Sequence, residues 1–97
     1  MAQPALDPDT VVMRAADVVA VHVGAVLVLH DPRGDTYVRL NESGAAVWER
    51  LSRPCSLAEL GAALSERYRV PATDALQDAR RLVLGLMARG MLAVDQG

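Results

Sequence analysis

Lysine and phenylalanine are absent from this 97-residue sequence, and cysteine occurs only once. The single Cys55 excludes an internal disulfide, and no second cysteine or histidine stands near it at metal-ligand spacing. All of the basic residues are arginine, and the formal net charge is -2. This balance provides no long-range attraction to nucleic acid or to an anionic membrane surface.

Long apolar runs are missing as well. The longest, residues 18–29, is interrupted by His22 and Gly24 and is far shorter than the ~20 residues that span a bilayer. The N-terminus has no basic segment followed by an apolar one, so the sequence indicates no secretory signal. We therefore expect a soluble, cytoplasmic protein without a membrane partner. Residues 1–10 are expected to form a flexible arm, and residues 11–97 a single domain.

The first half of the sequence has the pattern of β-strands. Valine-rich runs at residues 18–23 and 25–30 predict two strands that are buried or nearly so. Residues 11–13 predict a further short strand. The stretch Asp31-Pro32-Arg33-Gly34-Asp35 is typical of a type I turn followed by a left-handed Gly34. It predicts an antiparallel hairpin that joins residues 25–30 to Thr36–Leu40.

The second half has the pattern of helices. Asn41 is a favourable N-cap for a helix over residues 42–51. Ser56 and Glu59 form a capping box that opens a second helix, which ends near residue 68. The resulting order of elements predicts an α+β fold. Its architecture would be winged helix-turn-helix-like, with a three-stranded antiparallel sheet followed by three helices.

The last predicted helix begins at a cap formed by Thr73 or Asp74 and ends before Gly90. It carries more apolar residues than one buried face requires. One stripe, assigned to the core, comprises Ala75, Ala79, Leu82 and Leu86. A second stripe, with Leu84 beside it, comprises Leu76, Arg80, Val83 and Met87. The second stripe either widens the core face or lies open to a partner.

Residues that could perform catalysis are few. His22 and His30 lie in predicted strands, where structural roles predominate, and neither stands in a metal-ligand pattern. Cys55 has no evident partner that would activate it as a nucleophile. No phosphate-binding glycine loop is present. We therefore predict a protein that is not an enzyme and that has no metal or cofactor.

DNA binding is an alternative, because two helices joined by a short turn resemble a helix-turn-helix. The arginines at positions 67, 69, 80 and 81 would then have to contact phosphates. Glu66, Asp74 and Asp78 lie among them, however, and DNA-binding domains usually show a clearer basic face. The sequence therefore disfavours a winged-helix regulator without excluding it.

The run Tyr37–Trp48 resembles the signature Y-x-x-L-N-x-x-G-x-x-x-W of PqqD-like proteins. It is followed, in the order of that family, by residues 56–60, 68–70, 78–86 and 90–92. The resemblance covers about residues 18–94. Each motif is weak alone, and the ordered set is fairly specific.

This resemblance implies a domain that recognises the leader region of a ribosomally synthesised precursor peptide. In the family, the leader adds a strand to an open sheet edge and places side chains in a groove against the third helix. The peptide-binding residues implied here are Thr36, Tyr37, Val38, Arg39, Leu40, Leu76, Arg80, Val83, Leu84 and Met87.

The sequence most resembles the free-standing version from lasso-peptide clusters, whose partner is a leader peptidase of the cysteine protease class. The version that serves a radical-SAM enzyme in pyrroloquinoline quinone synthesis is the nearest alternative, and an interaction module unrelated to peptide maturation is a third. An exposed strand edge would also allow two copies of the chain to pair weakly.

Overall fold

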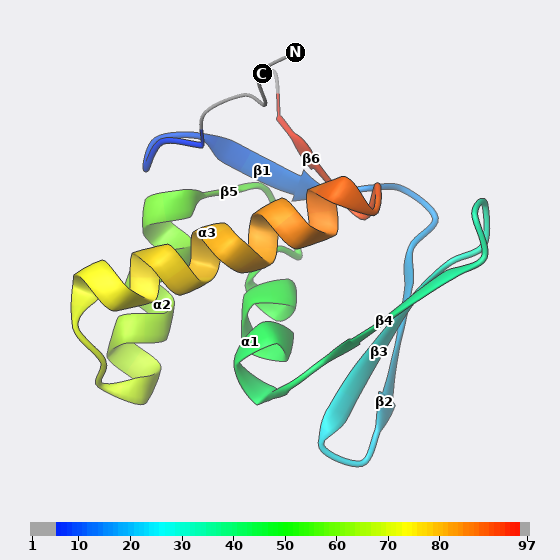
Figure 1. Ribbon diagram of the computed structural model, residues 1–97, viewed down its shortest axis with the longest axis horizontal. Coiled ribbons are helices and arrows are strands. Elements are labelled where there is room, and N and C mark those ends of the chain that lie inside the picture. The colour runs from blue at the N-terminus through cyan, green and yellow to red at the C-terminus, as the bar shows by residue number, and fades with distance from the viewer. Residues whose placement is uncertain (1–5, 96–97) are drawn as a thin grey trace.

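The computed structural model describes residues 6–95 and contains three helices and two three-stranded sheets. In Figure 1 one sheet lies above the helices and the other at the lower right. The predicted α+β class and the three helices are confirmed. The predicted three-stranded antiparallel sheet is present, and a second sheet beyond it combines one strand from each end of the described chain with a short strand between the first two helices.

The predicted hairpin forms one sheet in the order β2-β3-β4, with β2 (Val19–Val23), β3 (Val26–Asp31) and β4 (Thr36–Leu40). The last residue of β3 pairs with the first of β4, so four residues make the connecting turn. Its left-handed residue is Asp35, with φ 51°, and not the predicted Gly34.

The prediction that the first of these strands is buried is wrong. Every residue of β2 is exposed, whereas Leu27 and Leu29 of β3 are almost fully buried. The difference arises because β2 is a border strand of the sheet, while β3 lies in its centre and packs against α1 (Glu42–Arg50).

The second sheet has the order β5-β1-β6, with β1 (Val11–Arg14), β5 (Cys55–Ser56) and β6 (Leu92–Val94). Both outer strands pair antiparallel with β1. β1 therefore lies between the segment that links the first two helices and the chain after the third helix.

The expectation of a flexible arm fails for residues 6–10. Leu6 is buried in the core. The carbonyl oxygens of Pro8 and Thr10 accept hydrogen bonds from the backbone N–H groups of Ala58 and Leu57, at 2.9 Å each. Residues 1–5 of the predicted arm lie outside the described residues.

The predicted caps position α1 and α2 (Leu57–Tyr68). The Asn41 side chain accepts a hydrogen bond from the Gly44 N–H at the start of α1, at 2.9 Å. The capping box that begins at Ser56 is present at the start of α2. Because Asn41 directly follows β4, this cap fixes where α1 begins relative to the sheet edge.

The third helix, α3 (Ala72–Ala88), begins directly after Pro71 and has no side-chain cap, so the predicted capping role of Thr73 or Asp74 is wrong. Proline is tolerated at this place because the N–H that it lacks would have no intrahelical partner at the start of a helix.

The predicted end of α3 at Gly90 is confirmed. Gly90 has φ +75° and donates its N–H to the Met87 carbonyl, at 3.0 Å. The next N–H, that of Met91, reaches back to the Leu86 carbonyl, at 2.9 Å. These two bonds form a Schellman motif, which directs the chain into β6.

The core lies where α1, α2 and α3 meet the inner faces of both sheets. Trp48 is 2% exposed, as expected for a core residue, and the Arg14 guanidinium covers its ring at 4.6 Å. None of the helices within residues 6–95 has the length and apolar character needed to cross a membrane.

Candidate functional site

The free border of β4 is the first part of the candidate site. On one side β4 pairs along its whole length with β3, and no strand in the described chain pairs with its other side. Val38 and Leu40 turn inward, whereas Tyr37 and Arg39 are exposed. The unpaired backbone N–H and C=O groups of such an edge can accept another extended chain.

A cleft of about 560 Å³ adjoins the end of β4. Figure 1 shows that β4 leads directly into α1 and that α3 crosses the molecule above α1. The cleft lies between these elements and the end of α2. Its lining residues are Asn41, Ser43, Gly44, Leu64, Tyr68, Val70, Ala75, Asp78, Arg81 and Leu82.

The cleft combines an apolar lining with a few polar groups. Leu64 and Ala75 are buried in the core, and Leu82 is partly buried against it. The Tyr68 hydroxyl is buried and has no hydrogen-bond partner among the described residues. Since an unpaired buried polar group is costly, a bound molecule that donates to or accepts from this hydroxyl would gain affinity.

Charged residues stand on the α3 side of the cleft. A guanidinium nitrogen of Arg81 lies 3.6 Å from a carboxylate oxygen of Asp78, and both side chains are well exposed. An exposed pair of this kind contributes on the order of 1 kcal/mol or less. The pair can therefore rearrange to meet a charged or polar ligand at small cost.

The cleft identifies which side of α3 faces the start of α1, directly after β4. We call Asp78, Arg81, Leu82 and Gly85 the cleft flank of α3. Gly85 lies seven residues after Asp78 and four after Arg81, which places it on the same side of the helix. A Cβ added at Gly85 would have no heavy atom within 4 Å, so this position borders open space.

None of the predicted α3 residues lines this cleft. Val83 is fully buried and cannot line an open groove. Leu76 packs on α2, because a Cβ added at Gly61 would lie 3.1 Å from the Leu76 Cα atom. The Arg80 Nε atom donates a 3.1 Å hydrogen bond to the Leu6 carbonyl, so Arg80 does not stand at the rim beside β4.

The remaining two predicted α3 residues lie on the same side of the helix as Arg80. Leu84 and Met87 follow Arg80 by four and seven residues, and both are partly buried against the core. The structure therefore brings the predicted β4 residues to one edge but places the predicted α3 residues elsewhere. Leu82, assigned to the core from its spacing, is partly buried and lines the cleft.

The sequence contains one signal that could have identified the cleft flank. An isolated glycine inside a helical pattern costs about 1 kcal/mol relative to alanine, so a specific reason for its presence is expected. Gly85 is such a residue, and the absence of its side chain leaves room along the flank.

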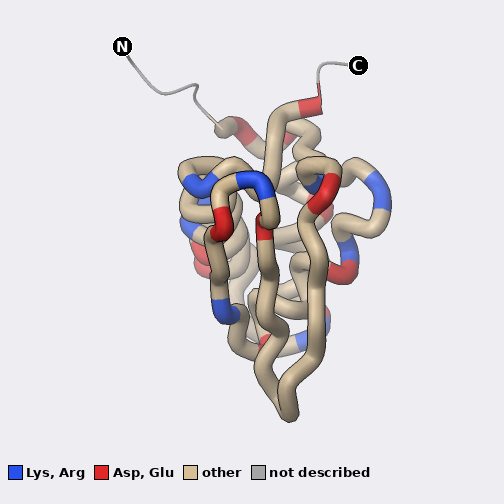
Figure 2. The backbone as a smooth tube through the Cα atoms, turned by 90° about the vertical axis from the view of Figure 1, so that its right-hand side faces the viewer, with Lys and Arg blue, Asp and Glu red and all other residues tan. Residues whose placement is uncertain are grey.

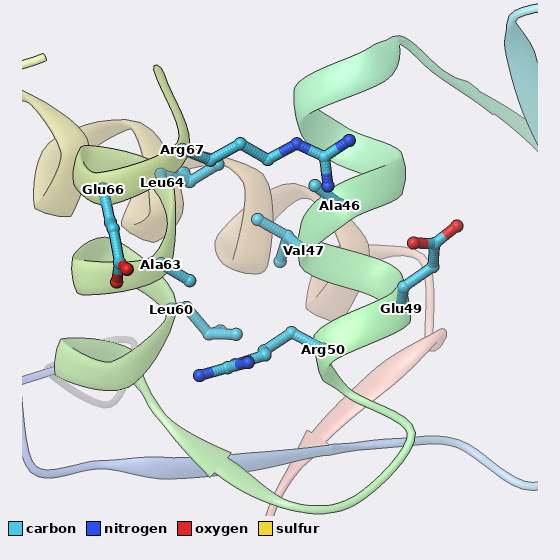
Figure 3. Close-up of a pocket in the computed structure, with 9 residues that line it drawn as sticks. All are labelled: Ala46, Val47, Glu49, Arg50, Leu60, Ala63, Leu64, Glu66 and Arg67. Carbon is cyan, nitrogen blue, oxygen red and sulfur yellow. The ribbon is translucent and has the colours of Figure 1, made fainter. Parts of the chain in front are cut away.

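A second cleft of about 560 Å³ lies between α1 and α2 and includes no residue of β4 or α3. Figure 3 shows Arg67 reaching from α2 toward α1 above Val47, with Arg50 below it. Charges of both signs border it, because Glu49 and Glu66 are also lining residues. None of its lining residues belongs to the β2–β3–β4 sheet.

The potential catalytic groups do not meet in either cleft. Burial raises the pKa of the Cys55 thiol, and its sulfur lies 3.3 Å from the Arg50 carbonyl oxygen. The His30 ring stacks on Tyr37 and lies 3.1 Å from an Asp35 carboxylate oxygen. Among residues 6–95, no three His, Cys, Asp or Glu side chains are grouped to hold a metal ion.

Comparison with protein families gives one decisive match. The model of the PqqD family, coenzyme PQQ synthesis protein D, matches residues 27–92. The chain belongs to this family. The resemblance inferred from the Tyr37–Trp48 signature is thereby confirmed. A comparison with curated protein sequences finds no match.

Solved structures of similar fold include two complexes with leader peptides. TbiB1 in complex with the TbiA(beta) leader peptide is 24% identical, with a TM-score of 0.73 over 82% of this chain and 93% of that chain. Lasso peptide synthetase B1 complexed with the leader peptide is 28% identical, with a TM-score of 0.73 over 84% and 96%.

A third structure extends the likeness to PqqD itself. It is the PqqD truncation of Methylobacterium extorquens PqqCD, described as a stand-alone RiPP recognition element. It is 16% identical, with a TM-score of 0.77 over 92% of this chain and 95% of that chain. At this identity the likeness establishes a shared fold.

Proposed function

We propose that this PqqD-family protein binds the leader region of a ribosomally synthesised precursor peptide, which adds as a strand to β4. The observation that carries the proposal is the unpaired edge of β4 next to the cleft. The similarity to lasso peptide synthetase B1, solved with a leader peptide, supports it. The bound precursor would then be delivered to a processing enzyme, with a lasso leader peptidase as our first candidate.

Two kinds of contact would contribute to recognition of the leader peptide. Backbone hydrogen bonds along β4 would hold any extended peptide, and alternate side chains would choose among peptides. On the inward side of the added strand, a leader side chain would meet Leu82 and the unpaired Tyr68 hydroxyl. Each buried aliphatic or aromatic anchor contributes about 1.5–3 kcal/mol. Contacts with Asp78 and Arg81 would contribute less, because both side chains are exposed.

The binding role we propose involves no catalysis by this chain. A nucleophilic cysteine must reach the thiolate form, and burial of Cys55 works against this by raising its pKa. Neither histidine is placed to activate a thiol or a hydroxyl in the cleft. His30 contacts Asp35, and His22 lies 3.8 Å from Glu49. Chemistry on the precursor would therefore belong to the partner enzyme.

The binding step is tested by fluorescence anisotropy. The probe is the fluorescein-labelled leader segment of a candidate precursor peptide, to be sought among the genes adjacent to this one, and a labelled DNA duplex is titrated in parallel. We expect saturable binding of the leader probe and none of the duplex at the same concentrations. Binding of the duplex with no binding of the leader would overturn the proposal.

Gly85→Leu tests where the peptide lies. The added side chain occupies the open space on the cleft flank and should weaken leader binding at least tenfold. It should not destabilise the fold, since leucine has a higher helix propensity than glycine by roughly 0.8 kcal/mol. Thr73→Leu adds bulk at an exposed position of the same helix, five residues before Asp78 and therefore off the cleft flank, and serves as the matched control. Equal affinities in the two variants would contradict this placement.

Delivery is tested separately with the complete precursor and a candidate leader peptidase of the cysteine protease class. We expect the rate of leader cleavage to rise when this protein is added and to fall again when isolated leader peptide is in excess. Leader binding without any change in cleavage rate would remove the delivery step and leave the binding function in place.

A further inference from the structure

The other border of the β2–β3–β4 sheet is also open. β2 pairs only with β3 in the described chain, and the pairing runs without a bulge along all of β2. Edge strands of monomeric proteins are commonly protected by charged residues, prolines or bulges. β2, with the sequence Val-Ala-Val-His-Val, has none of these protections.

The outer face of β2 is apolar. Val19, Val21 and Val23 point to the same side, and they are 50%, 53% and 62% exposed. They are paired with His30, Val28 and Val26 of β3, which share that face. Figure 2 views the sheet from this side and shows no Lys, Arg, Asp or Glu along β2 or in its turn into β3, at the bottom.

We infer that β2 is a self-association edge, at which a second copy of this chain pairs antiparallel about a two-fold axis through Val21. In this register Val19 lies opposite Val23 of the second copy, and Val21 lies opposite its own counterpart. A two-fold interface requires a patch that complements itself. The exposed valines of β2 meet this requirement, because Val19 and Val23 are placed symmetrically on either side of Val21. The pair forms one sheet of six strands and leaves both β4 edges free for peptide.

Charge favours β2 over β4 as the self-pairing edge. Two β4 strands paired about Val38 would bring their Arg39 side chains to the same face at a diagonal separation of roughly 7–8 Å, where like charges repel. The β2 pair contains no charged residue. Asp17, two residues before β2, would lie opposite the uncharged Ala25 of the second copy.

The size of the contact sets its strength. Five residues of β2 and three half-exposed valines per copy are fewer than the ~20–30 residues per partner of a standard stable interface. We therefore expect a weak dimer, with a dissociation constant on the order of 100 μM.

Sedimentation velocity of the full chain, from about 10 to about 500 μM, tests the dimer because this range brackets the expected dissociation constant. The average mass should rise toward that of a dimer. Val21→Glu places two carboxylates at the axis and should keep the protein monomeric, while the branched, uncharged Val21→Thr should still dimerise. A wild-type protein that stays monomeric throughout, or a Val21→Glu variant that dimerises normally, overturns the inference.

A charge pair tests the register. Val19→Lys and Val23→Glu should each weaken the dimer, and the double variant should restore it, since each new charge then faces its opposite across the axis. All three positions are at least half exposed, so the variants should melt close to the wild type in circular dichroism. A double variant no stronger than the single ones overturns the antiparallel register. Leader affinity should be the same for wild type and Val21→Glu.

Discussion

Leu82 and Val83 are neighbours in sequence but lie on different sides of α3, and this allows a sharp test of the site. Leu82 is partly buried and lines the cleft, whereas Val83 is fully buried in the core. The substitutions Leu82→Ala and Val83→Ala therefore remove apolar atoms from two adjacent positions with different roles. The first should affect peptide binding, and the second should affect stability.

The magnitudes follow from burial. Val83→Ala removes two buried carbon groups at about 0.8 kcal/mol each, and the cavity left behind adds to the cost. We expect a loss of about 2 kcal/mol in the free energy of unfolding, or roughly 10 °C in Tm for a domain of this size. In Leu82→Ala the lost contact with the peptide should cost about 1.4 kcal/mol of binding free energy, which is about tenfold in affinity.

Each variant is measured twice, by thermal melting in circular dichroism and by anisotropy with the leader probe at a temperature where both variants are folded. We expect Leu82→Ala to bind about tenfold more weakly, with a small change in Tm, because only part of its side chain is buried. We expect Val83→Ala to retain its affinity. The opposite result, weaker binding by a folded Val83→Ala with Leu82→Ala unaffected, would refute the assignment of the cleft flank.

Three further predictions concern the scaffold of the site. Ser56→Ala should lower the free energy of unfolding by about 1 kcal/mol in a denaturant titration, because the capping box of α2 is lost. Gly61→Ala should cost about 1–3 kcal/mol in the same titration, since the new Cβ would lie 3.1 Å from the backbone of Leu76, and an unchanged midpoint would contradict this close packing. A hydrogen bond from Arg33 holds the pKa of Asp31 below its usual value, so the pair stabilises the fold above about pH 4 and this contribution is lost as the pH falls further. Asp31→Asn should therefore reduce the dependence of Tm on pH below about pH 4, and the same slope in both proteins would count against this role.

Local signals in the sequence predicted much of the fold. The turn after residue 31, the Asn41 cap and the capping box at Ser56 each depend on a few adjacent residues, and all are present. The docking of Leu6 and the exposure of β2 were not predictable in this way. Both depend on contacts between segments far apart in the sequence, and a valine-rich run looks the same whether its strand is central or at a border.

The β4 side of the site could be predicted from the sequence, and the α3 side could not. Alternation in β4 correctly indicates that Leu40 turns inward and Tyr37 outward. The spacing of apolar residues in α3 defines a buried face with two flanks but does not indicate which flank turns toward β4. Packing decides this, through the close approach of Leu76 to Gly61 and the hydrogen bond from Arg80.

Strand addition at β4 is the central step of the proposed function, and amide hydrogen exchange measured by NMR tests it directly. In an antiparallel pair the N–H groups of alternate residues point to opposite sides. Saturation with the leader peptide should therefore slow exchange at every second amide of β4, namely those that point away from β3, and leave β2 unchanged. Leader binding that leaves the exchange of all β4 amides unaltered would contradict the account.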